Sequence, residues 1–307
     1  MISRTDIEQA NARIKGRVRR TPVIEASGFG TPDPLLLKLE YMQYTGSFKP
    51  RGAFNAMLSA PSIPAVGVVA VSGGNHGAAV GYVATALGAA SRIFAPSYSS
   101  AVKVGRMRGF GATVDLLPTV AEAFAAADAY HKEKGAFYLH PYDQVEIVTG
   151  QGTVGLELEE DAPDIDTVVV SVGGGGLVGG IAAWYGGKVR VVAVESEGTP
   201  TMANAFREGI DARTVPSGIA ADALGGPYVG KAAFEIAKQF VDPPILVPDD
   251  AIFAAQRLLW DNLRVVLEPG GVTALAVLTS GAYKPKPGER VAVVLCGANA
   301  DPAWFAA

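Results

Sequence analysis

One stretch of this chain constrains its fold more than any other: an apolar, β-branched run that leads directly into four consecutive glycines. The run covers residues 167–172, the glycines are Gly173, Gly174, Gly175 and Gly176, and a helical pattern begins at Leu177. Glycines between a strand and a helix let the backbone wrap closely around a ligand, and a helix N-terminus favours an anion such as phosphate. Without a ligand, the same residues predict a tight turn that allows close packing of strand and helix.

Two kinds of phosphate ligand fit this loop. Gly174, Gly176 and Gly179 match the G-x-G-x-x-G pattern of dinucleotide-binding folds. Glu195 ends the next β-branched run about 20 residues further on, where such folds carry an acidic residue for the ribose. On this segment alone, an NAD-binding oxidoreductase therefore stays open beside other proteins that bind a phosphate ligand.

The rest of the chain alternates short β-branched runs with helix-length segments. The runs lack strict polar alternation, which is typical of parallel strands buried on both faces. The pattern predicts an α/β fold with two lobes of parallel-sheet βα units and a cleft between them. The large domain would hold residues 1–50 and 145–307, and the small domain residues 51–144. The predicted strands are 35–39, 68–72, 92–95, 113–117, 167–172, 190–195, 245–247 and 291–295, and the predicted helices include 75–87, 120–133, 146–160, 177–185 and 249–262.

Composition argues against several function classes. A formal net charge of −4 and the lack of a dense Lys/Arg stretch argue against nucleic acid as a partner. Cys296 is the single cysteine, so neither an internal disulfide nor a multi-thiolate metal site can form, and His76, His131 and His140 lack metal-ligand spacing. We therefore expect no metal and a location in the reducing cytoplasm.

Neither export nor membrane insertion is expected. The first eight residues lack the apolar core of a signal peptide and instead predict a helix start, with Thr5 and Glu8 as its capping box. Residues 168–187 are uncharged and long enough to span a bilayer, but eight of these twenty residues are glycine. A loop between a strand and a helix explains this segment better.

A lysine in residues 45–53 stands in a restrained setting. Lys49 lies between Phe48 and Pro50, after a Gly-Ser turn and before a predicted helix. A lysine that forms a Schiff base must lose its proton, which desolvation or a neighbouring cation such as Arg51 would promote. Phe48 could pack against a flat ring. The local sequence alone favours a solvated lysine at the start of a helix over a Schiff-base lysine.

Four segments together resemble one protein family. They are residues 47–53 (Ser-Phe-Lys-Pro-Arg-Gly-Ala), 72–77 (Ser-Gly-Gly-Asn-His-Gly), the four glycines at 173–176, and 296–299 (Cys-Gly-Ala-Asn). Their order and spacing over nearly the whole chain resemble the serine/threonine dehydratase (threonine ammonia-lyase) family of fold-type II pyridoxal-phosphate enzymes. The resemblance implies a tryptophan-synthase-β-like fold with pyridoxal 5'-phosphate in the cleft between the lobes.

The resemblance also implies roles for residues of this chain. Lys49 would hold the cofactor as a Schiff base and, once the substrate amine displaces it, remove the Cα proton. A neutral Cys296 would face the pyridine nitrogen, where it favours departure of a β-hydroxyl over transamination. The remaining cofactor-binding residues would be Phe48, Asn75, Gly173, Gly174, Gly175, Gly176 and Leu177, and those around the substrate carboxylate Ser72, Gly73, Gly74, Asn75 and His76.

Each of these residues also has an interpretation that involves no ligand. Ser72 and Asn75 could cap a helix, and His76 could be a buried, hydrogen-bonded histidine without an acid–base role. Cys296, at the end of a strand, could be a small buried hydrophobe. Glu268 lies in a segment, 267–271, that resembles one lining the cofactor, although a carboxylate at the start of a helix is equally consistent with the sequence.

Two departures from the family pattern affect the predicted reaction. Racemising members carry a second serine after the one that matches Ser72, and this chain has Gly73 there, so we expect dehydration. Some relatives bind a cation in the region that corresponds to Glu195, and an acidic ligand of that site is replaced here by Thr201. The expected reaction is elimination of water from L-threonine, L-serine or both, giving a 2-keto acid and ammonia, with a racemase or a β-substituting synthase as alternatives. By resemblance and by general frequency, a homodimer is expected.

Overall fold

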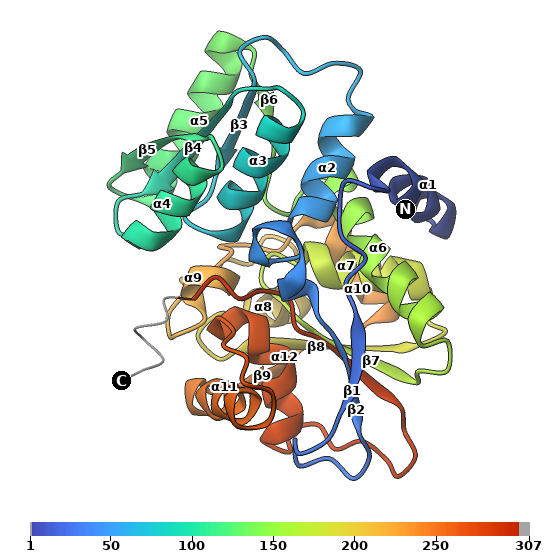
Figure 1. Ribbon diagram of the computed structural model, residues 1–307. Helices are drawn as coiled ribbons and strands as arrows, with labels where there is room; N and C mark the ends of the chain where they lie inside the picture. The colour runs from blue at the N-terminus through green and yellow to red at the C-terminus, as the bar shows by residue number, and fades with distance from the viewer. Residues whose placement is uncertain (1, 301–307) are drawn as a thin grey trace.

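The computed structural model describes residues 2–300, in which two separate sheets form the framework (Figure 1). The larger sheet has the strand order β1-β2-β10-β7-β8-β9. Strand β1 is antiparallel to β2, and the remaining neighbours are parallel. The strands are β1 (Val23–Ala26), β2 (Leu35–Lys38), β7 (Thr167–Ser171), β8 (Arg190–Ser196), β9 (Ile245–Val247) and β10 (Val291–Val294).

The smaller sheet has the order β5-β4-β3-β6 with all neighbours parallel. Its strands are β3 (Val68–Val71), β4 (Ser91–Pro96), β5 (Thr113–Leu117) and β6 (Phe137–Tyr138). The chain reaches it through two short 3-10 turns, η1 (Glu40–Met42) and η2 (Tyr44–Gly46), and through helix α2 (Pro50–Ser59). Helices α3 (Asn75–Ala86), α4 (Ala101–Gly109) and α5 (Val120–Lys134) connect its strands.

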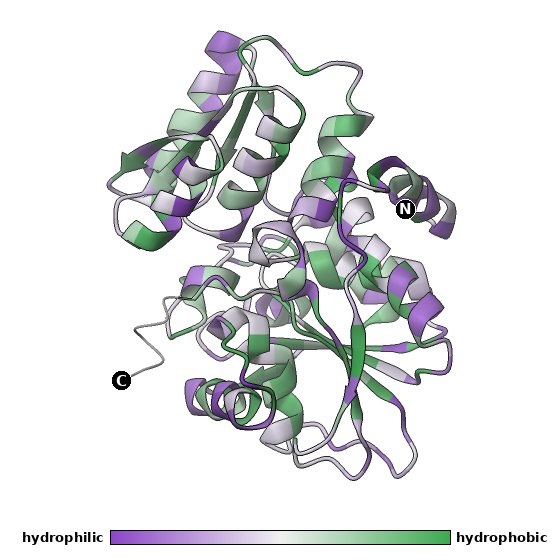
Figure 2. Ribbon diagram, viewed as in Figure 1, coloured by the Kyte–Doolittle hydropathy of each residue, from purple (hydrophilic) through white to green (hydrophobic). Residues whose placement is uncertain are grey.

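Two apolar clusters, one on each face, bury the larger sheet. Alternation along β7 separates them, because Val168 and Val170 belong to one cluster and Val169 to the other. Figure 2 shows the apolar residues concentrated along the strands and the inner helix surfaces. The first cluster includes α1 (Arg4–Ile14), α6 (Val145–Asp161), α7 (Gly176–Tyr185), α8 (Thr201–Glu208) and α10 (Lys231–Phe240); the second includes α9 (Ala221–Leu224), α11 (Asp249–Leu263) and α12 (Pro269–Thr279).

The predicted α/β fold is confirmed, and each predicted strand is present. Strands β1 and β6 were not predicted, because β1 is a half-buried edge strand and β6 has only two residues. The capping box predicted at Thr5 and Glu8 is wrong. Ser3 caps α1 instead, with its side chain accepting from the amide of Asp6 and the Asp6 carboxylate accepting from the Ser3 amide. Within residues 2–300, no helix is long and apolar enough to cross a membrane.

The connections bring three segments together. Helix α3 begins just after β3, α7 begins just after β7, and the residue before α2 is Lys49. The carboxyl ends of parallel strands and the N-termini of the helices that follow them are the usual ligand-binding edge of such sheets. The smaller and the larger sheet therefore direct their binding edges toward a shared space.

Candidate active site

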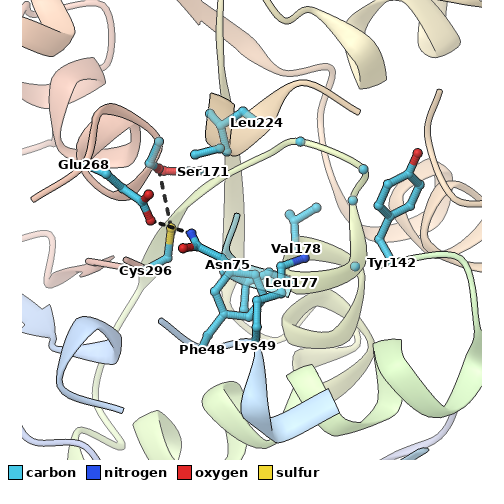
Figure 3. Close-up of a pocket in the computed structure, with 16 residues that line it drawn as sticks. Phe48, Lys49, Asn75, Tyr142, Ser171, Leu177, Val178, Leu224, Glu268 and Cys296 are labelled. Carbon is cyan, nitrogen blue, oxygen red and sulfur yellow. Dashed lines mark hydrogen bonds between the residues drawn. The ribbon is translucent and has the colours of Figure 1, made fainter. Parts of the chain in front are cut away.

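A narrow cavity occupies this space, and its walls come from loops and helix ends next to both sheets (Figure 3). Lys49 precedes α2, Asn75 begins α3, the four glycines join β7 to α7, and Cys296 follows β10. These segments are distant in sequence, so only the fold brings them together. The lining residues are Phe48, Lys49, Asn75, Tyr142, Ser171, Gly173, Gly174, Gly175, Gly176, Leu177, Val178, Ala223, Leu224, Glu268, Gly270 and Cys296.

Lys49 is held at the cavity wall. It is the N-cap residue of α2, and Pro50 occupies the first position of that helix, where the missing amide proton costs nothing. Its Nζ donates a hydrogen bond of 2.9 Å to the carbonyl oxygen of Pro141 and lies 5.1 Å from the centroid of the Phe48 ring. Burial lowers the pKa of Lys49 to about 8, with Cys296 and Glu268 acting in the opposite direction.

The sequence suggested two causes for a lowered Lys49 pKa, desolvation and the neighbouring cation Arg51. Arg51 does not contribute to the shift. Its fully buried guanidinium forms hydrogen bonds of 2.8 Å to both Glu40 and Glu157. Glu157 also accepts from Nζ of the buried Lys38 at 2.8 Å. The positive charges of Arg51 and Lys38 are therefore balanced by the carboxylates of Glu40 and Glu157. Desolvation, and not a free positive charge on Arg51, lowers the Lys49 pKa.

The glycine loop forms a cradle that side chains would fill. Gly175 has a φ of 89°, in the left-handed region that favours glycine. A Cβ atom at Gly174 would lie 2.2 Å from the ring of Tyr142, and one at Gly173 would lie 2.9 Å from the carbonyl oxygen of Leu224. Because α7 starts directly after these residues, its free amides and dipole face the cavity and can bind a phosphate.

The Glu195 side chain contacts the start of α8 and not the glycine loop. It is fully buried, and its two carboxylate oxygens accept hydrogen bonds from the amides of Met202 (2.7 Å) and Ala203 (2.9 Å) in the first turn of α8. Burial raises the pKa of Glu195 to about 8, against the effect of these amides. Because the Glu195 side chain is fully buried and contacts the start of α8, a ribose could not reach it, which removes one support for the dinucleotide interpretation. Residues 2–300 contain no cluster of three or more His, Cys, Asp or Glu side chains able to hold a metal, and the expectation that the protein needs no metal stays a prediction.

Asn75 and Glu268 join the start of α3, beside the smaller sheet, to the start of α12, beside the larger sheet. Asn75 Nδ2 donates to Glu268 Oε1 at 2.5 Å, and Asn75 Oδ1 accepts from Asn299 Nδ2 at 2.6 Å. Glu268 is the residue before α12, but its side chain turns into the cavity and leaves the helix amides uncapped. Its Oε2 has no hydrogen-bond partner among the described residues, and the nearest cation is Lys103 Nζ at 3.7 Å. Burial raises the pKa of Glu268, and Lys103 opposes this shift.

The predicted substrate loop reaches this cavity only through Asn75. Ser72 Oγ accepts from the amide of Gly74 at 3.1 Å, so this hydroxyl stabilises the turn before α3. His76 is buried, its Nε2 is 3.0 Å from the carbonyl oxygen of Leu139, and burial lowers its pKa to about 3, which fits the interpretation without an acid–base role. Roles of Ser72, Gly73, Gly74 and His76 toward a substrate carboxylate stay predictions.

Ser99 fills the space beside Gly73. A Cβ atom at Gly73 would lie 2.5 Å from Ser99 Oγ, whose buried hydroxyl has no hydrogen-bond partner among the described residues. Racemising relatives carry a serine at this position, where Gly73 has no side chain. The hydroxyl of a residue on the loop after β4 stands there instead.

Cys296 lies with Ser171 and Glu268 at one end of the cavity (Figure 3). Its Sγ is 3.4 Å from the carbonyl oxygen of Gly270, to which the thiol donates. Burial raises the pKa of Cys296 to about 12, and the neighbouring Glu268 acts in the same direction. The group at this end is therefore an uncharged thiol at neutral pH.

Several lining residues were not predicted from sequence. Tyr142 is the most consequential, because its ring packs against Gly174 and its main chain follows the Pro141 carbonyl that accepts from Lys49. It lies where the chain returns from the smaller to the larger sheet, between β6 and α6. No periodicity or turn pattern marks this segment. The others are Ser171, Val178, Ala223 and Leu224, whereas Gly270 belongs to the segment 267–271 already expected near the cofactor.

Comparisons with known proteins agree with this geometry. Residues 14–297 match the family model described as "Pyridoxal-phosphate dependent enzyme". A phenylserine dehydratase from Ralstonia pickettii is 36% identical over 96% of this chain and 92% of its own, and an L-threonine ammonia-lyase from Thermotoga maritima is 36% identical over 98% and 76%. The structure of a threonine deaminase from T.th. superposes with a TM-score of 0.90 at 33% identity, covering 98% of this chain and 99% of that one. Maize serine racemase superposes with a TM-score of 0.92 at 31% identity, over 99% and 96%.

Proposed function

Because the chain belongs to the family of pyridoxal-phosphate dependent enzymes, we propose that it eliminates water from a hydroxyamino acid and releases a 2-keto acid and ammonia. L-threonine and L-serine are the substrates that the sequence predicts. The observation that carries the proposal is one cavity in which Lys49, the glycine cradle, Asn75 and an uncharged Cys296 face one another.

The residues of this cavity fit the cofactor. Pyridoxal phosphate needs an amine for its aldehyde, an anion site for its phosphate and a partner for its pyridine nitrogen. Lys49, the amides at the start of α7 and Cys296 offer these groups on separate walls. When bound, the cofactor supplies the electron sink that lets a Cα–H bond break.

Lys49 would act as the base. Its pKa of about 8 leaves a useful fraction of neutral amine near neutral pH, whereas an ordinary lysine would be almost entirely charged. The Pro141 carbonyl oxygen orients Nζ without adding charge. The neutral amine can then take the Cα proton of a substrate held beside it.

Cys296 would tune the reaction outcome. The Cys296 thiol is uncharged at neutral pH because its pKa lies near 12, so it would not stabilise a protonated pyridine nitrogen as a carboxylate would. A cofactor held beside this thiol would supply a weaker electron sink, which would favour early departure of the β-hydroxyl. This supports elimination over transamination.

A racemase is the second candidate, since maize serine racemase is among the structural relatives. Racemisation needs an acid on the face of the substrate opposite the base. Gly73 provides no side chain for this role, and the neighbouring Ser99 hydroxyl does not line the cavity. These observations favour elimination.

The proposal is tested on the purified protein with pyridoxal phosphate. We expect a yellow protein whose cofactor is fixed to Lys49 by borohydride, which peptide mass spectrometry locates. Addition of L-threonine or L-serine should release 2-oxobutyrate or pyruvate and ammonia, and Lys49→Ala should abolish the colour and the release. A chiral assay for D-serine detects racemisation in the same samples. A protein that stays colourless, or a yellow one that yields no keto acid from any hydroxyamino acid, would contradict the proposal. The cytoplasmic location and the homodimer stay predictions.

A further inference from the structure

A second cavity lies next to the candidate active site, and mainly aromatic side chains line it. Its volume is about 390 Å³. The walls come from α5, from β6 and the residues after it, and from the loop before α10. The lining residues are Phe124, Asp128, His131, Tyr138, His140 and Tyr228.

One three-residue segment links the two cavities. The His140 ring lines the second cavity, the Pro141 carbonyl oxygen accepts from Lys49 Nζ at 2.9 Å, and Tyr142 lines the first cavity. The His140 and Tyr142 rings meet edge to face with centroids 4.8 Å apart. His140, which lines the second cavity, therefore directly precedes Pro141, whose carbonyl oxygen positions Lys49 Nζ.

The wall nearest Lys49 is uncharged. His140 Nδ1 accepts from the amide of Asp143 at 2.9 Å, which leaves Nε2 to carry the proton and donate to the Tyr228 hydroxyl, 3.1 Å away. Burial lowers the pKa of His140 to about 4, so the ring is neutral at physiological pH. The one carboxylate, Asp128, is paired with Lys132 at 2.6 Å on the exposed side of α5.

The size and lining of this cavity suit a flat aromatic group. The rings of Phe124, Tyr138 and Tyr228 all lie within 6.4 Å, centroid to centroid, of the His140 ring. Aromatic rings at such distances pack edge to face or offset, and a substrate ring that enters the cavity can pack against them in the same ways. An apolar cavity of about 150 Å³ is enough to hold a benzene molecule. A methyl group, as in threonine, would leave most of these ring faces without a contact.

We propose that this aromatic cavity receives the side chain of the substrate, so that the preferred substrates are hydroxyamino acids with an aryl group on the β-carbon, such as 3-phenylserine. The inference rests on the proposed function and narrows its substrate class. Loss of the β-hydroxyl as water, followed by uptake of one water on hydrolysis, converts phenylserine into phenylpyruvate and ammonia. These two products together contain all atoms of the substrate.

The test compares substrates and two variants of one helix in the holoenzyme. Phe124→Ala removes a ring from the cavity, and Tyr130→Ala removes a half-buried ring from the same helix, where it contacts Phe94 outside the cavity. We expect kcat/KM for L-threo-3-phenylserine to exceed that for L-threonine at least about tenfold. Phe124→Ala should lower the phenylserine value by about 10-fold to 100-fold and the threonine value less than about threefold. Tyr130→Ala should change both values less than about threefold.

A binding measurement separates this inference from the reaction. L-phenylalanine and L-alanine lack the β-hydroxyl, so calorimetry on the holoenzyme reports affinity alone. We expect phenylalanine to bind more tightly than alanine, and Phe124→Ala to weaken only phenylalanine. Equal losses for both ligands, or an unselective wild type, would overturn the aromatic cavity even if threonine is dehydrated. Selective phenylalanine binding without any keto-acid release would instead keep the cavity and defeat the proposed function.

Discussion

Lys49 Nζ lies 2.9 Å from the carbonyl oxygen of Pro141, and this hydrogen bond joins the start of α2 to the segment that returns the chain to the larger sheet. The acceptor is neutral, so it fixes the position of the amine without stabilising its charged form as a carboxylate would. Desolvation is therefore not cancelled, and the pKa of Lys49 falls to about 8.

The first prediction concerns the pH dependence of cofactor loading. A free lysine would gain reactive neutral amine up to its ordinary pKa of about 10.4, but Lys49 is already mostly neutral above pH 8. The rate at which the apoprotein combines with pyridoxal phosphate should rise up to about pH 8 and then level off. Stopped-flow absorbance between pH 6 and 10 measures it, with Lys49→Arg as the unreactive control. A rate that keeps rising to pH 10 would show that the amine is not desolvated.

The lowered pKa of Lys49 should also destabilise the folded protein at neutral pH. Because the folded-state pKa is lower than the unfolded-state value, the unfolded chain binds more protons between pH 8 and 10.5. The destabilisation by Lys49 is therefore fully present below pH 8 and disappears as the pH approaches 10.5. Lys49→Met should stabilise the apoprotein by about 1–3 kcal/mol at pH 7 and by little at pH 10.5, as urea denaturation at the two pH values will show. An equal gain at both would exclude proton linkage.

The buried ion network around Arg51 should be sensitive to loss of one partner. Arg51→Met leaves Glu40 and Glu157 buried with less compensation, which should lower the free energy of unfolding by about 3–5 kcal/mol. Arg20→Met is the matched control, because Arg20 is half-exposed in its pairs with Glu160 and Asp161 and should cost less than about 1 kcal/mol. Urea denaturation of both variants gives the comparison. Similar costs would mean that burial adds nothing to this network.

The glycine cradle should not tolerate a methyl group. Gly174→Ala places its Cβ into the Tyr142 ring, and such overpacking costs about 1–3 kcal/mol, so affinity for pyridoxal phosphate should fall about tenfold or more. Gly105→Ala is the control, since a Cβ there meets nothing within 4 Å and lies in α4. Fluorescence titration of the apoproteins measures both affinities. Unchanged binding by Gly174→Ala would place the phosphate elsewhere.

A serine at position 73 should require a second change. In Gly73→Ser the new Cβ meets Ser99 Oγ, so the loop before α3 must shift and kcat/KM should fall about tenfold or more. Ser99→Ala removes the hydroxyl in question and should return most of the lost activity when combined with Gly73→Ser. Kinetics and melting temperatures of the two single variants and the double variant form a double-mutant cycle. Additive effects would mean that the two residues do not compete for space.

Local patterns in the sequence were sufficient for every parallel strand except β6, and the order and spacing of four motifs were sufficient for the family. A β-branched run followed by glycines and a helical pattern depends on neighbouring residues only, so the β7–α7 unit could be predicted without tertiary information. The edge strand β1 and the two-residue β6 could not, since pairing with a neighbour, more than their composition, makes them strands.

By itself the sequence determined the fold class, the family, and Lys49 and the four glycines as the residues to examine. Only the tertiary structure decided that Glu40 and Glu157 neutralise Arg51, that Ser99 fills the space beside Gly73, and that aromatic rings gather around His140. The physical reason is the range of the interactions. Strand and helix patterns arise between neighbours along the chain, whereas desolvation, charge balance and cavity shape depend on segments that lie far apart until the chain folds.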